Sequence, residues 1–120
     1  MSQFVDVGYK GIALTETVGQ FLRTDATGTL CGIAERGIGV TQVDGVSGDV
    51  VSVALWSKAG TMKVVASAAI SKDAIIYSAA SGKVGASAST SYKLGIALEA
   101  AATNNDIIEM LPLVGDTVVP

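Results

Sequence analysis

The chain has 120 residues, enough for one domain with one hydrophobic core, and 49% of them are hydrophobic while only 5% are aromatic. Its net charge is −3 and its eight lysines and arginines are scattered along the chain, so we expect no direct nucleic-acid partner. Histidine is absent, which excludes Ser-His-Asp and Cys-His nucleophilic sites and removes the ligand that most zinc sites use.

The chain begins with MSQFVDVGYK, which lacks the basic and apolar regions of a signal peptide. The longest strongly apolar runs, such as VVSVALW at 50–56, are far too short to span a bilayer. We therefore expect a soluble protein that is made in the cytoplasm and has no membrane partner.

The N-terminal segment is aromatic-rich for this chain. Termini are poorly ordered unless something ties them down, so apolar residues there suggest a surface to dock against. We predict an extended arm over residues 1–10, which adds as a strand to a neighbour's sheet edge, and a single β domain over 11–120. A first strand that completes the chain's own sheet is an equally good interpretation. The arm residues predicted to contact a partner are Phe4, Val5, Val7 and Tyr9.

The residues that could carry chemistry are isolated. Cys31 is the single cysteine, so it forms no internal disulfide, and its apolar run TLCGIA indicates a small buried side chain. Each aspartate neighbours a turn residue or starts a strand, which is the ordinary use of aspartate in loops. The loop DGVSGD at 44–49 lacks the alternating oxygen ligands of a calcium site. The sequence therefore predicts no enzyme, no bound metal and no cofactor.

The first clear strand–loop–strand pattern is IGVTQVDGVSGDVVSVALW at 38–56. It starts apolar-Gly-apolar, passes through a loop of small and polar residues, and reaches an apolar strand after Asp49. Trp56, the only tryptophan, closes this strand and is a candidate anchor at a contact with another protein. A position in the chain's own core is the simpler interpretation, since large aromatic side chains are mostly buried within their domain.

Further strands follow at short spacing. Residues 61–66, TMKVVA, alternate between apolar and polar, which predicts a strand with Lys63 facing solvent. Residues 74–78, AIIYS, read as a strand that a turn at 80–82 joins to the next one in a hairpin. Turn signals recur about every ten residues. The predicted fold class is all-β, a small antiparallel sandwich or barrel with at most one short helix.

Residues 94–113, LGIALEAAATNNDIIEMLPL, admit two interpretations. Alanine, leucine and glutamate favour a short helix, whereas the period of two in the first five residues favours a strand. The segment repeats the plan of 38–56, with Asp106 before its last strand as Asp49 stands in the earlier copy. Because the earlier loop is too rich in glycine and aspartate to be helical, we predict strand, loop and strand, with at most one helical turn at 99–102.

Residues 60–84, GTMKVVASAAISKDAIIYSAASGKV, followed by 94–113, resemble the small capsid cement proteins of tailed bacteriophages. Those proteins share a Gly-Thr-x-Lys strand, an AAI…Tyr strand, an Ala/Ser-Gly-Lys-Val turn and a segment of the form apolar-Gly-Ile-Ala-Leu-Glu-Ala-Ala, in this order. The segment 38–56 fits the earlier part of the family pattern. The similarity is clearest over 32–111 and departs at both ends of the chain.

The resemblance implies a structural role in the virion. Such proteins bind the outer surface of the phage head in many copies, often as trimers, and hold adjacent coat subunits together. The implied partners are the major capsid protein and other copies of this chain, in a homotrimer, and the implied place of synthesis is the host cytoplasm. The family supplies no catalytic residue. A fibre-associated or receptor-binding β-module of the same virion is the alternative.

Overall fold

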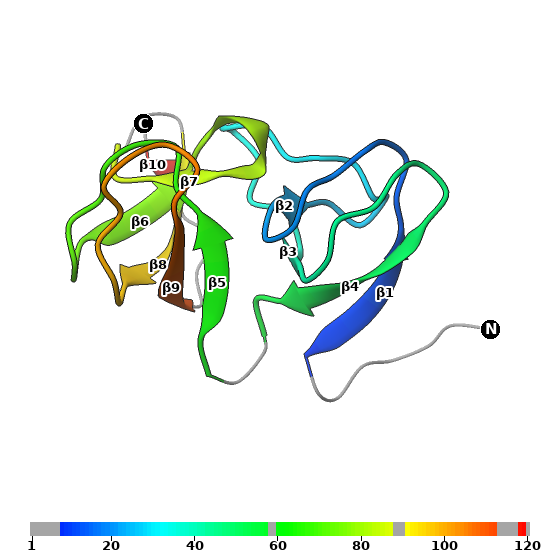
Figure 1. The fold of residues 1–120 in the computed structure, drawn as a ribbon, viewed down its shortest axis with the longest axis horizontal. Helices are drawn as coiled ribbons and strands as arrows, with labels where there is room; N and C mark the ends of the chain where they lie inside the picture. Colours follow the sequence, from blue (N-terminus) through cyan, green and yellow to red (C-terminus); the bar gives the residue numbers. More distant parts are fainter. Residues whose placement is uncertain (1–7, 58–59, 88–90, 113–117, 120) are drawn as a thin grey trace.

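The strands follow runs rich in valine, isoleucine and threonine, because β-branched side chains pack well on a pleated surface. The computed structural model describes residues 8–57, 60–87, 91–112 and 118–119 (Figure 1). The predicted all-β fold is confirmed for these residues. Their elements are β1 (Tyr9–Ala13), β2 (Arg23–Thr24), β3 (Gly39–Thr41), β4 (Val50–Leu55), β5 (Met62–Val65), β6 (Ile75–Ser78), the 3₁₀ turn η1 (Ala80–Gly82), β7 (Val84–Gly85), β8 (Ser91–Ala97), β9 (Ile107–Pro112) and β10 (Val118–Val119).

The loop at 99–102 contains no helical turn. Ala101 instead bridges Ile70, and each backbone N–H donates to the other residue's carbonyl oxygen at 2.9 Å. The helix-forming composition of this loop does not decide its structure. The pairing of Ala101 with Ile70 already satisfies backbone N–H and carbonyl groups that a helical turn would otherwise pair. The predicted hairpin is confirmed, since η1 joins β6 to β7 and places Ser78 opposite Val84.

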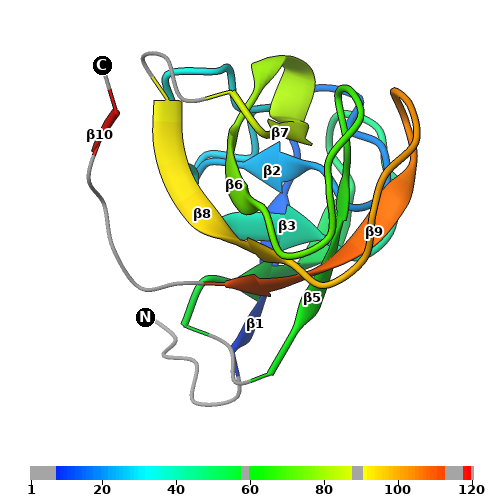
Figure 2. The ribbon, with the colours of Figure 1, turned by 90° about the vertical axis from the view of Figure 1, so that its left-hand side faces the viewer.

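The paired strands of the described residues are all antiparallel and form two sheets. One sheet has the order β1-β4-β3-β2, and the other has the order β5-β9-β8-β6-β7 with β10 beside β8. Neither order returns to its first strand, so neither described sheet is a closed barrel. The two sheets lie side by side along the long axis of the molecule, which measures 42 × 26 × 25 Å (Figure 1). Figure 2 looks along this axis with the second sheet in front.

The two sheets share one plan. When β1, β2, β3 and β4 are matched with β5, β6, β8 and β9, both sheets have the same strand order. We call residues 8–57 the first unit, and residues 60–87 and 91–112 the second unit. The strand–loop–strand plan predicted for residues 94–113 is confirmed, and the likeness between the two halves of the chain extends to all four matched strands.

The correspondence also holds for individual residues. In the first unit, Thr24 of β2 lies opposite Gly39 of β3. In the second unit, Ile76 of β6 lies opposite Gly95 of β8. Since a shift of one residue would turn every side chain to the other face of a sheet, equal register means that matched positions face the same way in both units.

The approach to the second strand is the same in both units. Phe21 has a left-handed backbone, with φ of 62°, and its N–H donates to the carbonyl of Thr41 at 2.8 Å. Asp73 has φ of 71°, and its N–H donates to the carbonyl of Ala97 at 2.8 Å. Few residues other than glycine adopt positive φ, so the shared conformation reflects a shared backbone path rather than a shared residue type.

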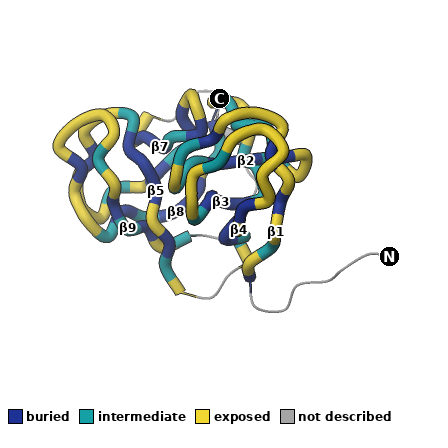
Figure 3. The backbone as a smooth tube through the Cα atoms, turned by 45° about the vertical axis from the view of Figure 1, so that its right-hand side comes forward, coloured by how far each residue is buried: buried dark blue, intermediate teal, exposed yellow. Residues whose placement is uncertain are grey.

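Each unit has an apolar core on the inner face of its sheet, and exposed loops at both ends (Figure 3). The core of the second unit also takes in two buried residues from β3 and β4 of the first, which ties the units together. The first core comprises Ile12, Leu14, Val18, Val51 and Val53. The second comprises Met62, Val64, Ala66, Ile70, Ile76, Val84, Leu94, Ala97, Ala101, Ile108 and Met110, together with Val40 and Ala54 of the first unit.

Candidate interaction surfaces

Of the four arm residues predicted to contact a partner, Tyr9 is the one that the structure describes, and it begins β1. It lies opposite Ala54 of β4 and its side chain is 40% exposed. Tyr9 lines a hollow of about 330 Å³ together with residues of both units, among them Phe21 and Lys63. The chain's own sheet therefore starts within the segment predicted as an arm, while Phe4, Val5 and Val7 lie outside the described residues.

Trp56 directly follows β4 and is half-buried. Its Nε1 donates to the carbonyl of Gly37 at 2.9 Å, and the guanidinium carbon of Arg36 lies 5.8 Å from the ring centroid. The ring also packs against the core of the second unit. These contacts hold Trp56 within its own domain and leave part of the side chain accessible to another molecule.

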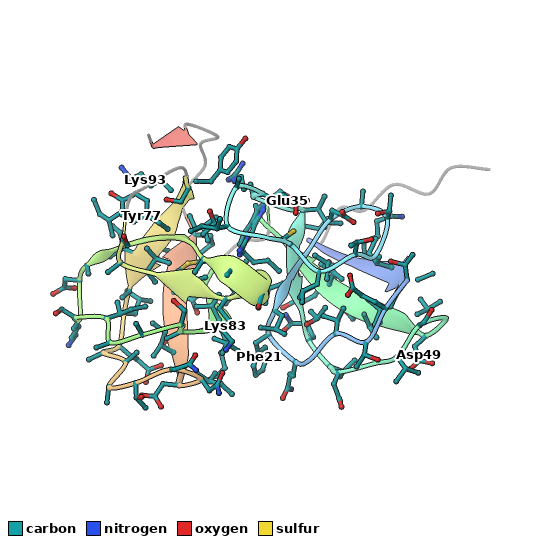
Figure 4. The ribbon with its side chains drawn as sticks, turned by 90° about the horizontal axis from the view of Figure 1, so that it is seen from above. Phe21, Glu35, Asp49, Tyr77, Lys83 and Lys93 are labelled. Atoms are coloured by element: carbon teal, nitrogen blue, oxygen red, sulfur yellow. The ribbon has the colours of Figure 1, made fainter. Side chains whose placement is uncertain are left out.

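The loop between β3 and β4 carries exposed apolar side chains, although its other residues are polar or glycine. Val43 is 48% exposed, Val46 is 55% exposed and Val50 is 70% exposed. We call these three residues the valine end. Asp49 fixes the loop by accepting the N–H of Val46 at 3.0 Å, and it lies at the extreme of the first unit (Figure 4). Exposed apolar groups that are held in place on a fixed loop suit a binding surface.

The second unit presents a matching residue. Ile107 begins β9 as Val50 begins β4, and it is 49% exposed. The loop before it is held in the same way, because Asp106 accepts the N–H groups of Ala102 at 2.7 Å and Thr103 at 3.1 Å. Each unit thus presents an exposed aliphatic residue at the start of its last matched strand.

The described residues contain no group of three or more histidine, cysteine, aspartate or glutamate side chains that could hold a metal ion. The prediction that Cys31 is buried is confirmed, since its exposed fraction is 1%. Burial raises the pKa of the Cys31 thiol to about 11, with the charge of Arg23 opposing the shift and the charges of Glu35 and Asp25 adding to it. A thiol in this state is neutral at physiological pH and is a poor nucleophile.

A larger hollow, of about 630 Å³, lies beside β6 and β7 and is lined mainly by alanine, serine and glycine. Ser78 is its most constrained polar residue. The Ser78 hydroxyl donates to the carbonyl of Ile33 at 2.6 Å and accepts the N–H of Tyr92 at 2.8 Å. Because both hydrogen bonds serve the fold, this serine is not poised for chemistry.

Arg23 is the residue that sequence reasoning missed. Its side chain is fully buried, and its guanidinium donates only to backbone carbonyls among the described contacts. Nε donates to Lys83 at 3.1 Å and Nη2 to Gly32 at 3.1 Å, while further bonds reach Glu35 and Ala79. An arginine directly after the apolar pair Phe21 and Leu22 is the signal that could have indicated it, since buried charges need partners. The side chain joins a loop of the first unit to the turn around η1 in the second.

These features define a class: the described residues form an all-β protein that exposes several large aliphatic side chains. No described helix is long and apolar enough to cross a membrane. Residues 9–112 match the phage cement protein family, and the chain belongs to that family. It is therefore a structural protein of the bacteriophage virion, associated with the capsid, in a family that is not a class of enzymes. A search of curated proteins finds no match to this chain.

Proposed function

We propose that the protein binds the outer surface of the phage head as a homotrimer, contacts the major capsid protein and stabilises the contacts between neighbouring coat subunits. The observation that carries this proposal is the family membership of residues 9–112. Phe4, Val5 and Val7 of the N-terminal arm, together with Tyr9 and Trp56, remain proposed contact residues.

The arrangement of exposed apolar residues supports a bridging role. The valine end lies on the first unit and Ile107 on the second, in a molecule 42 Å long. A protein with a contact residue on each unit can touch two coat subunits at once. Two linked contacts hold far more strongly than either alone, because the second forms at a high effective concentration.

Such a role requires no chemistry from the protein. Any molecule that binds the assembled head and not its separated parts shifts the equilibrium toward the assembled state by mass action. The stabilisation grows with the concentration of the bound protein relative to its dissociation constant. This fits a chain that exposes several large aliphatic side chains.

The proposal is tested by mixing purified protein with undecorated heads and measuring co-sedimentation over a range of protein concentrations. Saturable binding, together with increased resistance of the heads to heat or chelation, is expected. Binding to tail fibres or host cells in place of heads would favour the fibre-associated alternative and contradict the proposal.

A matched pair of variants tests the bridging surface. Val50→Glu places a charge on the valine end and should weaken head binding by about tenfold or more. Ala34→Glu adds the same charge on an exposed loop between β2 and β3, outside the valine end, and should leave binding unchanged. Equal binding by both variants would show that the valine end does not contact the coat.

A further inference from the structure

The hollow of about 330 Å³ that Tyr9 lines is built by both units of the chain. Two of its polar side chains are already engaged within the fold. Gln42 donates from Nε2 to the carbonyl of Val40 at 3.0 Å, and the Thr61 hydroxyl donates to the Glu109 carboxylate. The lining also includes the large apolar side chains of Phe21 and Met62. The hollow therefore suits an apolar occupant.

The size of the hollow fits one large side chain. Pockets that hold small ligands have volumes from about 300 Å³ upward, so this hollow is at the lower end of that range. Aromatic side chains bury the most apolar area of all side chains, and they stack on other aromatic rings such as that of Phe21. A single aromatic ring is therefore the group that the hollow fits best.

β5 lines the hollow at Met62 and Lys63, and it is an edge strand. Among the described strands it pairs only with β9. The N–H of Ala66 donates to the carbonyl of Asp106 at 2.8 Å, and hydrogen-bonded pairs alternate along an antiparallel ladder. Met62 and Val64 are therefore the residues of β5 that bond to β9, and the backbone N–H and carbonyl of Lys63 point away from it. An extended segment that lies along this edge can add to the sheet as a further strand.

The chain itself supplies an apolar segment at this place. The chain is fixed in β1 from Gly8, whose carbonyl accepts the N–H of Leu55 at 2.8 Å, and the next residue, Tyr9, lines the hollow. Phe4 stands five positions before Tyr9, and five extended residues span at most about 17 Å. A side chain on so short a tether has an effective concentration in the millimolar range, so it has a large advantage over a separate partner.

We infer that Phe4 occupies the hollow of its own chain, with the N-terminal segment lying along the edge of β5. Successive side chains of an extended segment alternate between two faces. Asp6 then shares the face of Phe4, where Lys63 carries the opposite charge, and Val5 and Val7 face away from the hollow. Phe4 is therefore the anchor of the arm, and the coat contact of the arm narrows to Val5 and Val7, a point that rests on the proposed function.

Fluorine NMR of the free protein tests the docking, because Phe4 and Phe21 are the only phenylalanines and Phe4→Leu assigns their two resonances. With fluorinated phenylalanine incorporated, the Phe4 resonance is expected to be displaced from its position in denaturant. Gln42→Trp fills the hollow and should return the resonance to that position. Ala34→Trp, on an exposed loop outside the hollow, should leave it displaced. A wild-type Phe4 resonance at the denatured position would overturn the inference, as would equal effects of the two tryptophan variants.

A disulfide trap tests whether the docking occurs within one chain. Asp6→Cys combined with Lys63→Cys should link within the chain on mild oxidation, and adding Phe4→Ala should slow the link by about tenfold or more, because the anchor is lost. The buried Cys31 does not compete. A link that joins two chains, a rate that does not depend on Phe4, or no link at all would overturn the inference.

Val5→Glu separates the docking from the coat contact. It should weaken head binding by about tenfold and leave the Phe4 resonance displaced, since Val5 is expected to face away from the hollow. A Val5→Glu protein whose Phe4 resonance moves to the denatured position would contradict the assigned faces. Because the NMR and disulfide experiments use no heads, a failure of the proposed function leaves their outcome unaffected.

Discussion

Gly39 and Gly95 occupy the same position in the two units, each directly against a carbonyl oxygen of the next strand. A Cβ at Gly39 would overlap the carbonyl oxygen of Ala54, and a Cβ at Gly95 would overlap that of Leu111. Neither glycine has a positive φ. Both are required by close backbone approach, which is one of the main reasons for glycine inside a strand.

Gly95→Ala should lower the free energy of unfolding by about 3 kcal/mol, because the methyl group meets backbone that can move only if strands β8 and β9 separate. Gly39→Ala should have a similar effect in the first unit. Urea denaturation measures both. Gly32→Ala is the control, since a Cβ there meets only the Glu35 carboxylate, at an ordinary distance of 3.5 Å. A Gly95→Ala protein as stable as the control would mean that the two strands are not packed as described.

Arg23→Met should destabilise the protein by about 3 kcal/mol or more, because several buried carbonyls lose their donor at once. Arg23→Lys should not restore the loss, since one ammonium cannot reproduce the planar fork of a guanidinium. Arg36→Met is the matched control and should cost about 1 kcal/mol through its stacking on Trp56. Thermal and urea denaturation give these differences, and an Arg23→Met protein no less stable than Arg36→Met would refute the role of the buried guanidinium.

The effect of Arg23 on stability should not vary around neutral pH. Burial, opposed by the charges of Cys31 and Glu35, lowers the pKa of Arg23 below its ordinary value, to about 10. Because the pKa is lower in the folded than in the unfolded protein, the penalty of burying the charge is fully present below pH 10 and is relieved only as the pH rises above that value. The difference in unfolding free energy between wild type and Arg23→Met should therefore be constant between about pH 5 and pH 9. A marked change of this free-energy difference with pH in that interval would indicate that a protonation state changes there, and would contradict the prediction.

The Cys31 thiol should not react with a thiol reagent at neutral pH in the folded protein and should react fully in denaturant. Burial raises its pKa from 9.0 to about 11, so the thiolate is rare below pH 9. The stability contributed by the neutral thiol is present below pH 9 and is lost as the pH rises through 11. Rapid stoichiometric labelling of the native protein would contradict this prediction.

Deletion of residues 2–7 should leave a folded domain that binds heads more weakly. The pairing of β1 with β4 begins at Tyr9, so the described sheet keeps all its strands after the deletion. Circular dichroism and head co-sedimentation measure the two effects separately. A truncated protein that unfolds would place this segment in the core and refute the proposed arm.

The local features of this protein could be predicted from its amino-acid sequence. Alternation predicted β5, and Lys63 is exposed between buried neighbours as that pattern requires. The glycine-containing turn at 80–82 predicted the hairpin of β6 and β7. The order of short motifs indicated the cement family, whose match covers 9–112. These features could be predicted because each depends on residues within a few positions of one another.

Which faces of the strands are buried depends on how the two units pack in three dimensions. The correspondence between β1 and β5 lies in how their backbones pair with β4 and β9. Such pairing tolerates different side chains, so it leaves little trace in the sequence. The carbonyls around Arg23 come from segments far apart in the chain, so no local pattern indicates them. Val40 and Ile96 are both aliphatic strand residues in matched positions, yet one is fully buried and the other is partly exposed. Alternation defines the two faces of a strand, but which face is covered depends on the packing of one unit against another, and that is a long-range property.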